Sequence, residues 1–225
     1  MVKNLVLLSG LLSNEMLWHH QAKALAPVAS ISIISSIDDS PEKMIKAILE
    51  KAPPRFALAG HSMGGWLALE VMRKAGERVE RLCLLNTTAR ADSSEKRERR
   101  RQMIELVKRG EFAQVVDSLV DLLVHKPEAK DEVRQMFLAV GPAVFIAQEE
   151  AMLKRQETES ILETITCPTL IIHAAEDKNF SAKEHEELEK GIRGSTLAIV
   201  KESGHMSPLE APQDVARLMR SWLSD

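Results

Sequence analysis

The segment Gly60-His-Ser-Met-Gly-Gly65 decides the fold, because it lies directly between an apolar run, Arg55–Ala59, and a helical pattern, Trp66–Met72. The order strand, Gly-x-Ser-x-Gly, helix predicts a turn so tight that the positions two before and two after the serine must lack a bulky side chain. Ser62 is expected to take a strained backbone conformation that lifts its hydroxyl above the sheet. We therefore predict that Ser62 is a nucleophile.

A phosphate-binding loop is the alternative interpretation of a glycine-rich turn before a helix. The segment lacks the Gly-x-Gly-x-x-Gly spacing of dinucleotide-binding loops, and no Lys-Ser or Lys-Thr pair follows it. Ser62 also opens a helix, so the backbone N–H of Met63 points to the place where an oxyanion would form. The nucleophile interpretation is favoured.

Outward from this segment, short apolar runs alternate with longer amphipathic patterns. Nearly continuous apolar runs are typical of strands that are covered on both faces of a parallel sheet. The predicted strands are Leu5–Leu8, Ile31–Ile34, Phe56–Ala59, Leu82–Leu85, Leu170–Ile172 and Leu197–Val200. The predicted helices between them are Glu15–Leu25, Pro41–Lys51, Met63–Lys74, Ala182–Lys190 and Pro212–Leu223. The alternation predicts an α/β fold, with a mostly parallel sheet of about six strands and helices on both faces.

One long segment interrupts the alternation. Between Ala89 and Thr164 no strand pattern occurs, and four helical stretches follow one another: Lys96–Lys108, Phe112–Val124, Ala129–Val140 and Ala143–Gln156. We predict a core made of residues 1–88 and 164–225, with a helical lid, residues 89–163, inserted between two strands. The charge-dense start of the lid, Glu95–Arg101, is interpreted as a solvated helix face rather than a basic docking site.

A serine hydroxyl is a poor nucleophile near neutral pH, so a base must lie elsewhere in the chain. His205 is the predicted base, because it follows the last predicted strand, where Gly204 permits a sharp turn. Ser207 and Glu210 are expected to form a capping box at the start of the helix that follows. From this loop His205 can reach Ser62 across the carboxyl edge of the sheet.

The base needs a carboxylate that holds its imidazole in the correct tautomer. Asp177 is the predicted acid, because it lies between Ser62 and His205 in the sequence and directly follows a strand end. Glu176 is the less favoured alternative, since adjacent loop residues diverge and only one can face the site. We interpret Glu176 as a surface residue.

The other histidines fit the role of base less well. His61 is adjacent to the serine and is expected to project away from it. His173 ends a predicted strand and is interpreted as a hydrogen-bonded structural residue. Four lie in helical patterns and are expected to be solvated: His19, His20, His125 and His185.

These motifs together resemble the α/β-hydrolase fold superfamily. The resemblance rests on Gly60–Gly65, on Ala175-Glu-Asp-Lys-Asn179, and on Ser203-Gly-His205 ahead of Pro208-Leu-Glu-Ala-Pro212, in the family's order Ser, Asp, His. It is specific over the predicted core and loose across the insert, which corresponds to the family's variable lid. It implies an eight-stranded core in full-length members, so the chain is expected to begin at the family's third strand.

The resemblance also implies an oxyanion hole. In that family the third strand ends in His-Gly-x, and the backbone N–H of x supplies half of the hole. The matching string is Leu8-Ser-Gly-Leu11, so the implied donors are the N–H groups of Leu11 and Met63. Ser9 stands where the family has histidine, and this departure predicts a looser loop.

Composition excludes several classes of function. The chain has 225 residues with 33 acidic and 30 basic side chains, so no charge excess favours a nucleic-acid partner. It has no tyrosine, which excludes chemistry that needs a phenol. Two cysteines in apolar contexts indicate reduced thiols and a cytoplasmic protein. The run Leu5–Leu12 is interrupted by polar residues and predicts a strand rather than a signal peptide, and no run is long enough to predict a membrane helix.

The predicted function is that of a serine hydrolase acting on a small or medium carboxylic ester, including a lactone or thioester, through an acyl-enzyme on Ser62. The expected partner is a small-molecule substrate, and no cofactor or metal is needed. Apolar residues at helical spacing in the lid favour an apolar acyl group. Two alternatives remain: the same triad used for C–C hydrolysis, lyase or cofactor-free haloperoxidase chemistry, and a non-catalytic ligand receptor.

Overall fold

A computed structural model describes residues 3–224 and contains one sheet of six parallel strands. The order across the sheet is β2-β1-β3-β4-β5-β6, so the chain starts at the second strand, adds β2 at the near edge, and then crosses over to build the other side. The strands are β1 (Lys3–Leu8), β2 (Ala29–Ile34), β3 (Phe56–His61), β4 (Val79–Leu85), β5 (Thr169–Ala174) and β6 (Thr196–Val200). The predicted α/β fold and all six predicted strands are confirmed.

The inner strands are largely apolar on both faces because each face contributes to a different core. Along β1, Leu5 and Leu7 pack into one cluster of buried side chains, and Val6 and Leu8 pack into the other. Successive side chains of a strand point to opposite faces, so a continuous apolar run buries both sides at once. This burial explains why the sequence shows runs rather than alternation.

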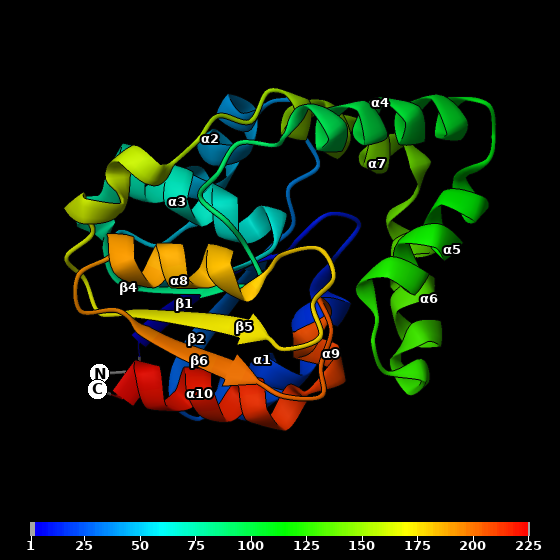
Figure 1. The fold of residues 1–225 in the computed structure, drawn as a ribbon. Helices are drawn as coiled ribbons and strands as arrows, with labels where there is room; N and C mark the ends of the chain where they lie inside the picture. The colour runs from blue at the N-terminus through cyan, green and yellow to red at the C-terminus, as the bar shows by residue number, and fades with distance from the viewer. Residues whose placement is uncertain (1–2, 225) are drawn as a thin grey trace.

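Helices cover both faces, as predicted. One face packs against α1 (His19–Leu25) and α10 (Pro212–Ser224), and the other packs against α2 (Pro41–Lys51), α3 (Met63–Ala75) and α8 (Ala182–Gly191) (Figure 1). The predicted helix from residue 15 begins instead as a short 3-10 turn, η1 (Glu15–Trp18), and a second such turn, η2 (Gly76–Arg78), precedes β4. A single turn of helix, α9 (Ser207–Glu210), precedes α10.

Between β4 and β5 the chain forms only helices and turns. They are α4 (Ser94–Lys108), α5 (Phe112–Leu123), α6 (Lys130–Val140) and α7 (Pro142–Leu153), with the 3-10 turns η3 (Pro127–Ala129) and η4 (Glu159–Thr164). Gly110 and Gly141 follow the ends of α4 and α6 with φ near +90°, a conformation that residues with a side chain rarely adopt. These helices lie beyond the carboxyl ends of the strands (Figure 1).

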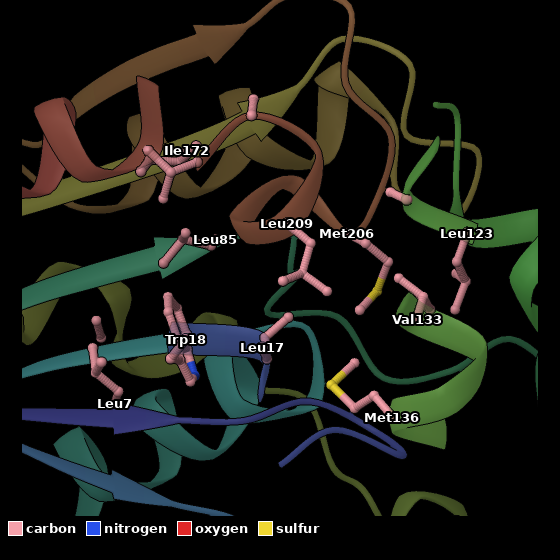
Figure 2. Close-up of a cluster of buried hydrophobic side chains, with 14 of the residues drawn as sticks. Leu7, Leu17, Trp18, Leu85, Leu123, Val133, Met136, Ile172, Met206 and Leu209 are labelled. Atoms are coloured by element: carbon pink, nitrogen blue, oxygen red, sulfur yellow. The ribbon is translucent and has the colours of Figure 1, made fainter. Parts of the chain in front are cut away.

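The lid shares a core with the sheet. Figure 2 shows buried side chains that run from the sheet, at Leu85 and Ile172, past Leu209 to Leu123 and Met136 in the lid. Trp18 and Phe137 in this cluster are among the largest fully buried side chains of the described residues. Burial of each large apolar side chain contributes roughly 1.5–3 kcal/mol. Since side chains of the lid and the sheet are buried in one cluster, their packing holds the lid against the core.

Within residues 3–224, no single helix is both long enough and apolar enough to cross a membrane. The segments 127–140 and 142–153 reach that length and apolar content only as a pair, and they are bent by 89° where they meet.

Candidate active site

The turn after β3 has the strained geometry that the sequence predicts. Ser62 has φ 56° and ψ −117°, a combination that non-glycine residues rarely adopt. A Cβ atom on Gly60 would lie 2.1 Å from the carbonyl oxygen of Gly64, and one on Gly64 would lie 2.3 Å from the carbonyl oxygen of Leu8. Both positions therefore exclude a side chain, and the turn presents Ser62 at the carboxyl edge of the sheet.

Asp177 and His205 meet at the same edge. The Nδ1–H of His205 donates to Oδ2 of Asp177 at 2.8 Å, while Oδ1 accepts the backbone N–H groups of Asn179 and Phe180 at 2.7 and 3.2 Å. Burial alone would raise the pKa of Asp177, but the His205 charge and these hydrogen bonds lower it by more, so it lies below its ordinary value. The carboxylate is ionised at neutral pH and fixes the imidazole with Nε2 free.

Ser62 and His205 line one cavity, which measures about 100 Å³. Across residues 3–224, the hydrogen bonds include none from the Ser62 hydroxyl to His205. Such contacts between nucleophile and base are often long until substrate binds. Apolar side chains form much of the wall: Met103, Leu119, Leu122, Leu123, Met152 and Phe180.

The two residues implied as oxyanion donors, Leu11 and Met63, line the same cavity. The loop that carries Leu11 is held firmly, contrary to the expectation from Ser9. The Ser9 hydroxyl donates to the carbonyl of Asn14 at 3.2 Å, and the next backbone N–H, that of Leu12, donates to Oε1 of Gln148 in the lid at 2.9 Å. Ser9 therefore tightens the loop through a hydrogen bond within it.

His61 does not project away from the site, and that expectation is wrong. Its ring lies 4.9 Å from the ring of His205, and its Nε2–H donates to the backbone carbonyl of His205 at 2.7 Å. Burial, with a smaller contribution from the His205 imidazole, lowers the pKa of His61 to about 3, so its ring is neutral. Position and charge make His61 a support for the predicted base.

Asn86 is a second support that sequence reasoning missed. Its Nδ2 donates to the His205 carbonyl at 2.7 Å and to the Ser207 hydroxyl at 3.0 Å, and its Oδ1 accepts the Ala174 N–H at 2.9 Å. Asn86 is fully buried directly after β4, so it connects two strand ends to the His205 loop. The signal available in the sequence was a polar residue after an apolar strand, Leu82–Leu85.

Glu210 does not form the expected capping box with Ser207. Its buried carboxylate instead accepts four backbone N–H groups, those of Gly204 and Met206 on either side of His205, and those of His125 and Lys126 in the lid. The N–H of His205 itself donates to the lid, to the carbonyl of Leu123 at 2.9 Å. The connection between α5 and α6 is thus bonded to the loop that carries the predicted base.

The charged start of the lid is not a fully solvated face, so that interpretation is wrong in part. Lys96 and Arg100 are turned inward and line the cavity, and Arg100 pairs with Asp92 at 2.6 Å and Glu149 at 2.5 Å. Arg101 follows the predicted behaviour, since its side chain is exposed.

His185, expected to be solvated, is buried against His173 with ring centroids 4.4 Å apart. The buried Nδ1 of His173 has no hydrogen-bond partner within residues 3–224, contrary to the interpretation of His173 as a hydrogen-bonded residue. Burial lowers the pKa of His185 to about 4, so it is neutral at neutral pH. No group of three or more His, Cys, Asp or Glu side chains within residues 3–224 is placed to hold a metal ion.

Comparison with solved structures shows the same fold. A thermophilic esterase from Thermogutta terrifontis superposes with a TM-score of 0.88 at 25% identity, covering 99% of this chain and 89% of that one. An enol-lactonase from Burkholderia xenovorans LB400 superposes with a TM-score of 0.88 at 19% identity, covering 100% and 92%. The second likeness, at this identity, concerns the fold alone.

Comparison of sequences gives relatives of low identity. The AB hydrolase superfamily protein YisY of Bacillus subtilis is 29% identical over 175 residues, which are 72% of this chain and 64% of YisY, less than two thirds of that protein. A pimeloyl-[acyl-carrier protein] methyl ester esterase of Nitrosomonas europaea is 26% identical over 189 residues, covering 78% and 74%. The model of the Alpha/beta hydrolase family matches residues 6–218. The chain therefore belongs to the α/β hydrolase family.

Proposed function

We propose that the protein is a serine hydrolase that cleaves carboxylic esters through an acyl-enzyme on Ser62. The observation that carries the proposal is the ionised Asp177 bonded to His205 at 2.8 Å, beside a cavity that also contains Ser62 on its strained turn. A serine, a base and an orienting carboxylate in this relation are the elements of nucleophilic acyl transfer.

The proposed reaction has two steps. His205 Nε2 accepts the hydroxyl proton as Ser62 Oγ bonds to the ester carbonyl carbon, and the oxyanion is held by the N–H groups of Leu11 and Met63. His205 returns the proton to the alkoxide as the bond to the alcohol breaks. A water molecule then repeats the sequence on the acyl-enzyme and releases the carboxylic acid. Asp177 stabilises the imidazolium in both steps.

The cavity supports a small or medium substrate. Apolar side chains from the lid, including Met103 and Leu119, face the same space as Ser62. A volume of about 100 Å³ leaves little room for a bulky acyl group. Relatives named as an esterase and a pimeloyl-[acyl-carrier protein] methyl ester esterase agree with ester chemistry. Apolar surface that lies beside convergent polar groups is typical of small-molecule sites.

The test has two measurements. A fluorophosphonate probe is expected to label wild type on Ser62 and not to label Ser62→Ala, because only an activated serine reacts. A series of p-nitrophenyl esters of increasing chain length is expected to be hydrolysed by wild type, with kcat reduced by roughly 10³-fold or more in His205→Ala.

The two measurements separate the possible outcomes. Folded wild type that is not labelled would overturn the nucleophile. Labelling without turnover of any ester would favour the alternative in which the same triad performs C–C hydrolysis, lyase or haloperoxidase chemistry.

A further inference from the structure

Part of the wall of the cavity is strongly basic. Lys96, Arg99 and Arg100 from α4 and Arg155 beyond α7 line the space that holds Ser62, and the carboxylate among the lining side chains is Glu149. The whole chain carries a net charge of −3, so this concentration of positive charge is local. A cleft lined by one sign of charge attracts ligands of the other sign.

Two of these cations are neutralised within the protein. Arg100 lies between Asp92 and Glu149, at 2.6 and 2.5 Å. Arg155 is 3.9 Å from the same Asp92 and donates to the carbonyl of Thr88 at 2.6 Å. Two arginines and two carboxylates therefore form a balanced buried group, which explains their presence without any ligand.

Lys96 and Arg99 are not balanced in this way. Within residues 3–224, neither has a carboxylate within 4.0 Å. The Lys96 ammonium is half-buried, lies 4.6 Å from the centre of the Phe180 ring and donates to the carbonyl of Asn179 at 3.3 Å. Burial lowers the pKa of Lys96, which means that the site disfavours the ammonium. A bound anion would offset that cost.

The position of Lys96 connects it to the chemistry. The Phe180 ring that it covers lies 5.6 Å from the ring of His205, so one aromatic ring separates the ammonium from the predicted base. Met103, one to two turns along α4 from both cations, faces the same cavity. A substrate that places its ester at Ser62 would cross apolar surface before it reaches the cations.

We propose that Lys96, with Arg99 beside it, forms an anion subsite, and that the preferred substrates are esters with a carboxylate several bonds from the scissile carbonyl. The proposal rests on the ester hydrolysis proposed above. The proposed substrate differs from the ester of an apolar acid that the sequence favours, because it needs both an apolar spacer and a charged end. The carboxylate can belong to the acyl part or to the alcohol part of the ester.

Two series of esters distinguish these sources. The first contains monomethyl esters of straight dicarboxylic acids, compared with methyl alkanoates of equal length. The second contains acetate esters of ω-hydroxycarboxylic acids, compared with acetates of simple alcohols. Wild type is expected to prefer the charged ester in one of the two series, the one whose carboxylate reaches the subsite. There kcat/KM should be roughly ten to a hundred times higher than for the uncharged ester, which is the effect of one charge-assisted hydrogen bond. That preference should shrink with added salt.

Substitutions on α4 test the role of Lys96. Lys96→Met keeps the length of the side chain without its charge and is expected to reduce the ratio of charged to uncharged kcat/KM by roughly tenfold or more. Lys96→Arg keeps the positive charge and is expected to retain most of the wild-type preference for the charged ester. The matched control is Arg101→Met, also on α4, because the Arg101 side chain is 53% exposed and lies outside the cavity lining.

The outcomes separate this proposal from the one on which it rests. Equal kcat/KM for charged and uncharged esters of both series in wild type, or an unchanged ratio in folded Lys96→Met, would overturn the anion subsite while ester hydrolysis stands. Wild type that hydrolyses no ester would overturn the proposed function itself. Protection of Ser62 from the fluorophosphonate by adipate, weaker in Lys96→Met, would support the subsite without any turnover.

Discussion

Glu210 offers the sharpest test of how the site is held together. Within residues 3–224 its carboxylate forms no hydrogen bond with Ser62, Asp177 or His205, yet it accepts N–H groups from two segments that are about 80 residues apart in the sequence. Glu210→Ala would remove the carboxylate and leave those groups facing a small void. Two of them flank His205, and two belong to the lid connection at His125 and Lys126.

The magnitude follows from the number of donors. Each buried N–H that loses its partner costs roughly 1–3 kcal/mol, so four set an upper range of about 4–12 kcal/mol. His125 is exposed, so water can reach part of the void and offset some of the loss. We expect the free energy of unfolding of Glu210→Ala to fall by about 4 kcal/mol. Because the His205 loop would shift, kcat/KM should fall by roughly a hundredfold.

Urea unfolding followed by circular dichroism measures the free energy of unfolding, and turnover of p-nitrophenyl esters at low urea measures kcat/KM. Glu210→Gln is a graded variant, since its amide retains one acceptor oxygen but turns an N–H₂ toward the remaining donors. It should lose roughly half as much stability. The matched control is Glu128→Ala, next to the same lid connection, because Glu128 is exposed. It should change the free energy of unfolding by less than about 0.5 kcal/mol.

A loss below about 1 kcal/mol in Glu210→Ala would show that water satisfies all four donors and would refute the argument from burial. Equal losses in Glu210→Ala and Glu128→Ala would refute it as well. A stable Glu210→Ala with full kcat/KM would show that the lid connection does not hold the predicted base.

Three further predictions concern the turn, the buried histidine and the buried amide. Gly60→Ala should abolish fluorophosphonate labelling, because its Cβ would meet the Gly64 carbonyl at 2.1 Å, whereas Gly76→Ala, with 3.5 Å to its nearest neighbour, should label normally. The pKa of His61 is depressed to about 3, so its neutral form stabilises the fold above pH 6.5 and that stability is lost as the pH falls. Between about pH 7 and pH 5 the free energy of unfolding, measured with urea, should therefore fall by about 2 kcal/mol less in His61→Gln than in wild type. Identical pH profiles of the two proteins would contradict this. Asn86→Leu should lower the free energy of unfolding by about 3 kcal/mol, because it leaves the His205 carbonyl and Ala174 N–H short of partners; a loss below about 1 kcal/mol would contradict it.

The sequence by itself determined the sheet and the predicted reactive residues. Strands buried on both faces must be continuously apolar, so Leu5–Leu8 and Leu82–Leu85 could be placed from local composition. The turn at Ser62 could be predicted from its own residues, because only glycine fits where an added Cβ would lie 2.1–2.3 Å from a backbone carbonyl oxygen. Asp177 and His205 followed from their places after strand ends, and the structure brings these two together at 2.8 Å.

Only the tertiary structure decided what surrounds those residues. Whether a charged or polar side chain is buried depends on partners that are distant in the chain: Glu210 binds His125, and Asn86 binds the carbonyl of His205. The same reason explains Lys96, which belongs to a helix that looks solvated by composition and yet faces the cavity. Hydrophobic periodicity records which face of an element is apolar, whereas the pairing of buried polar groups is fixed only when separate elements pack together.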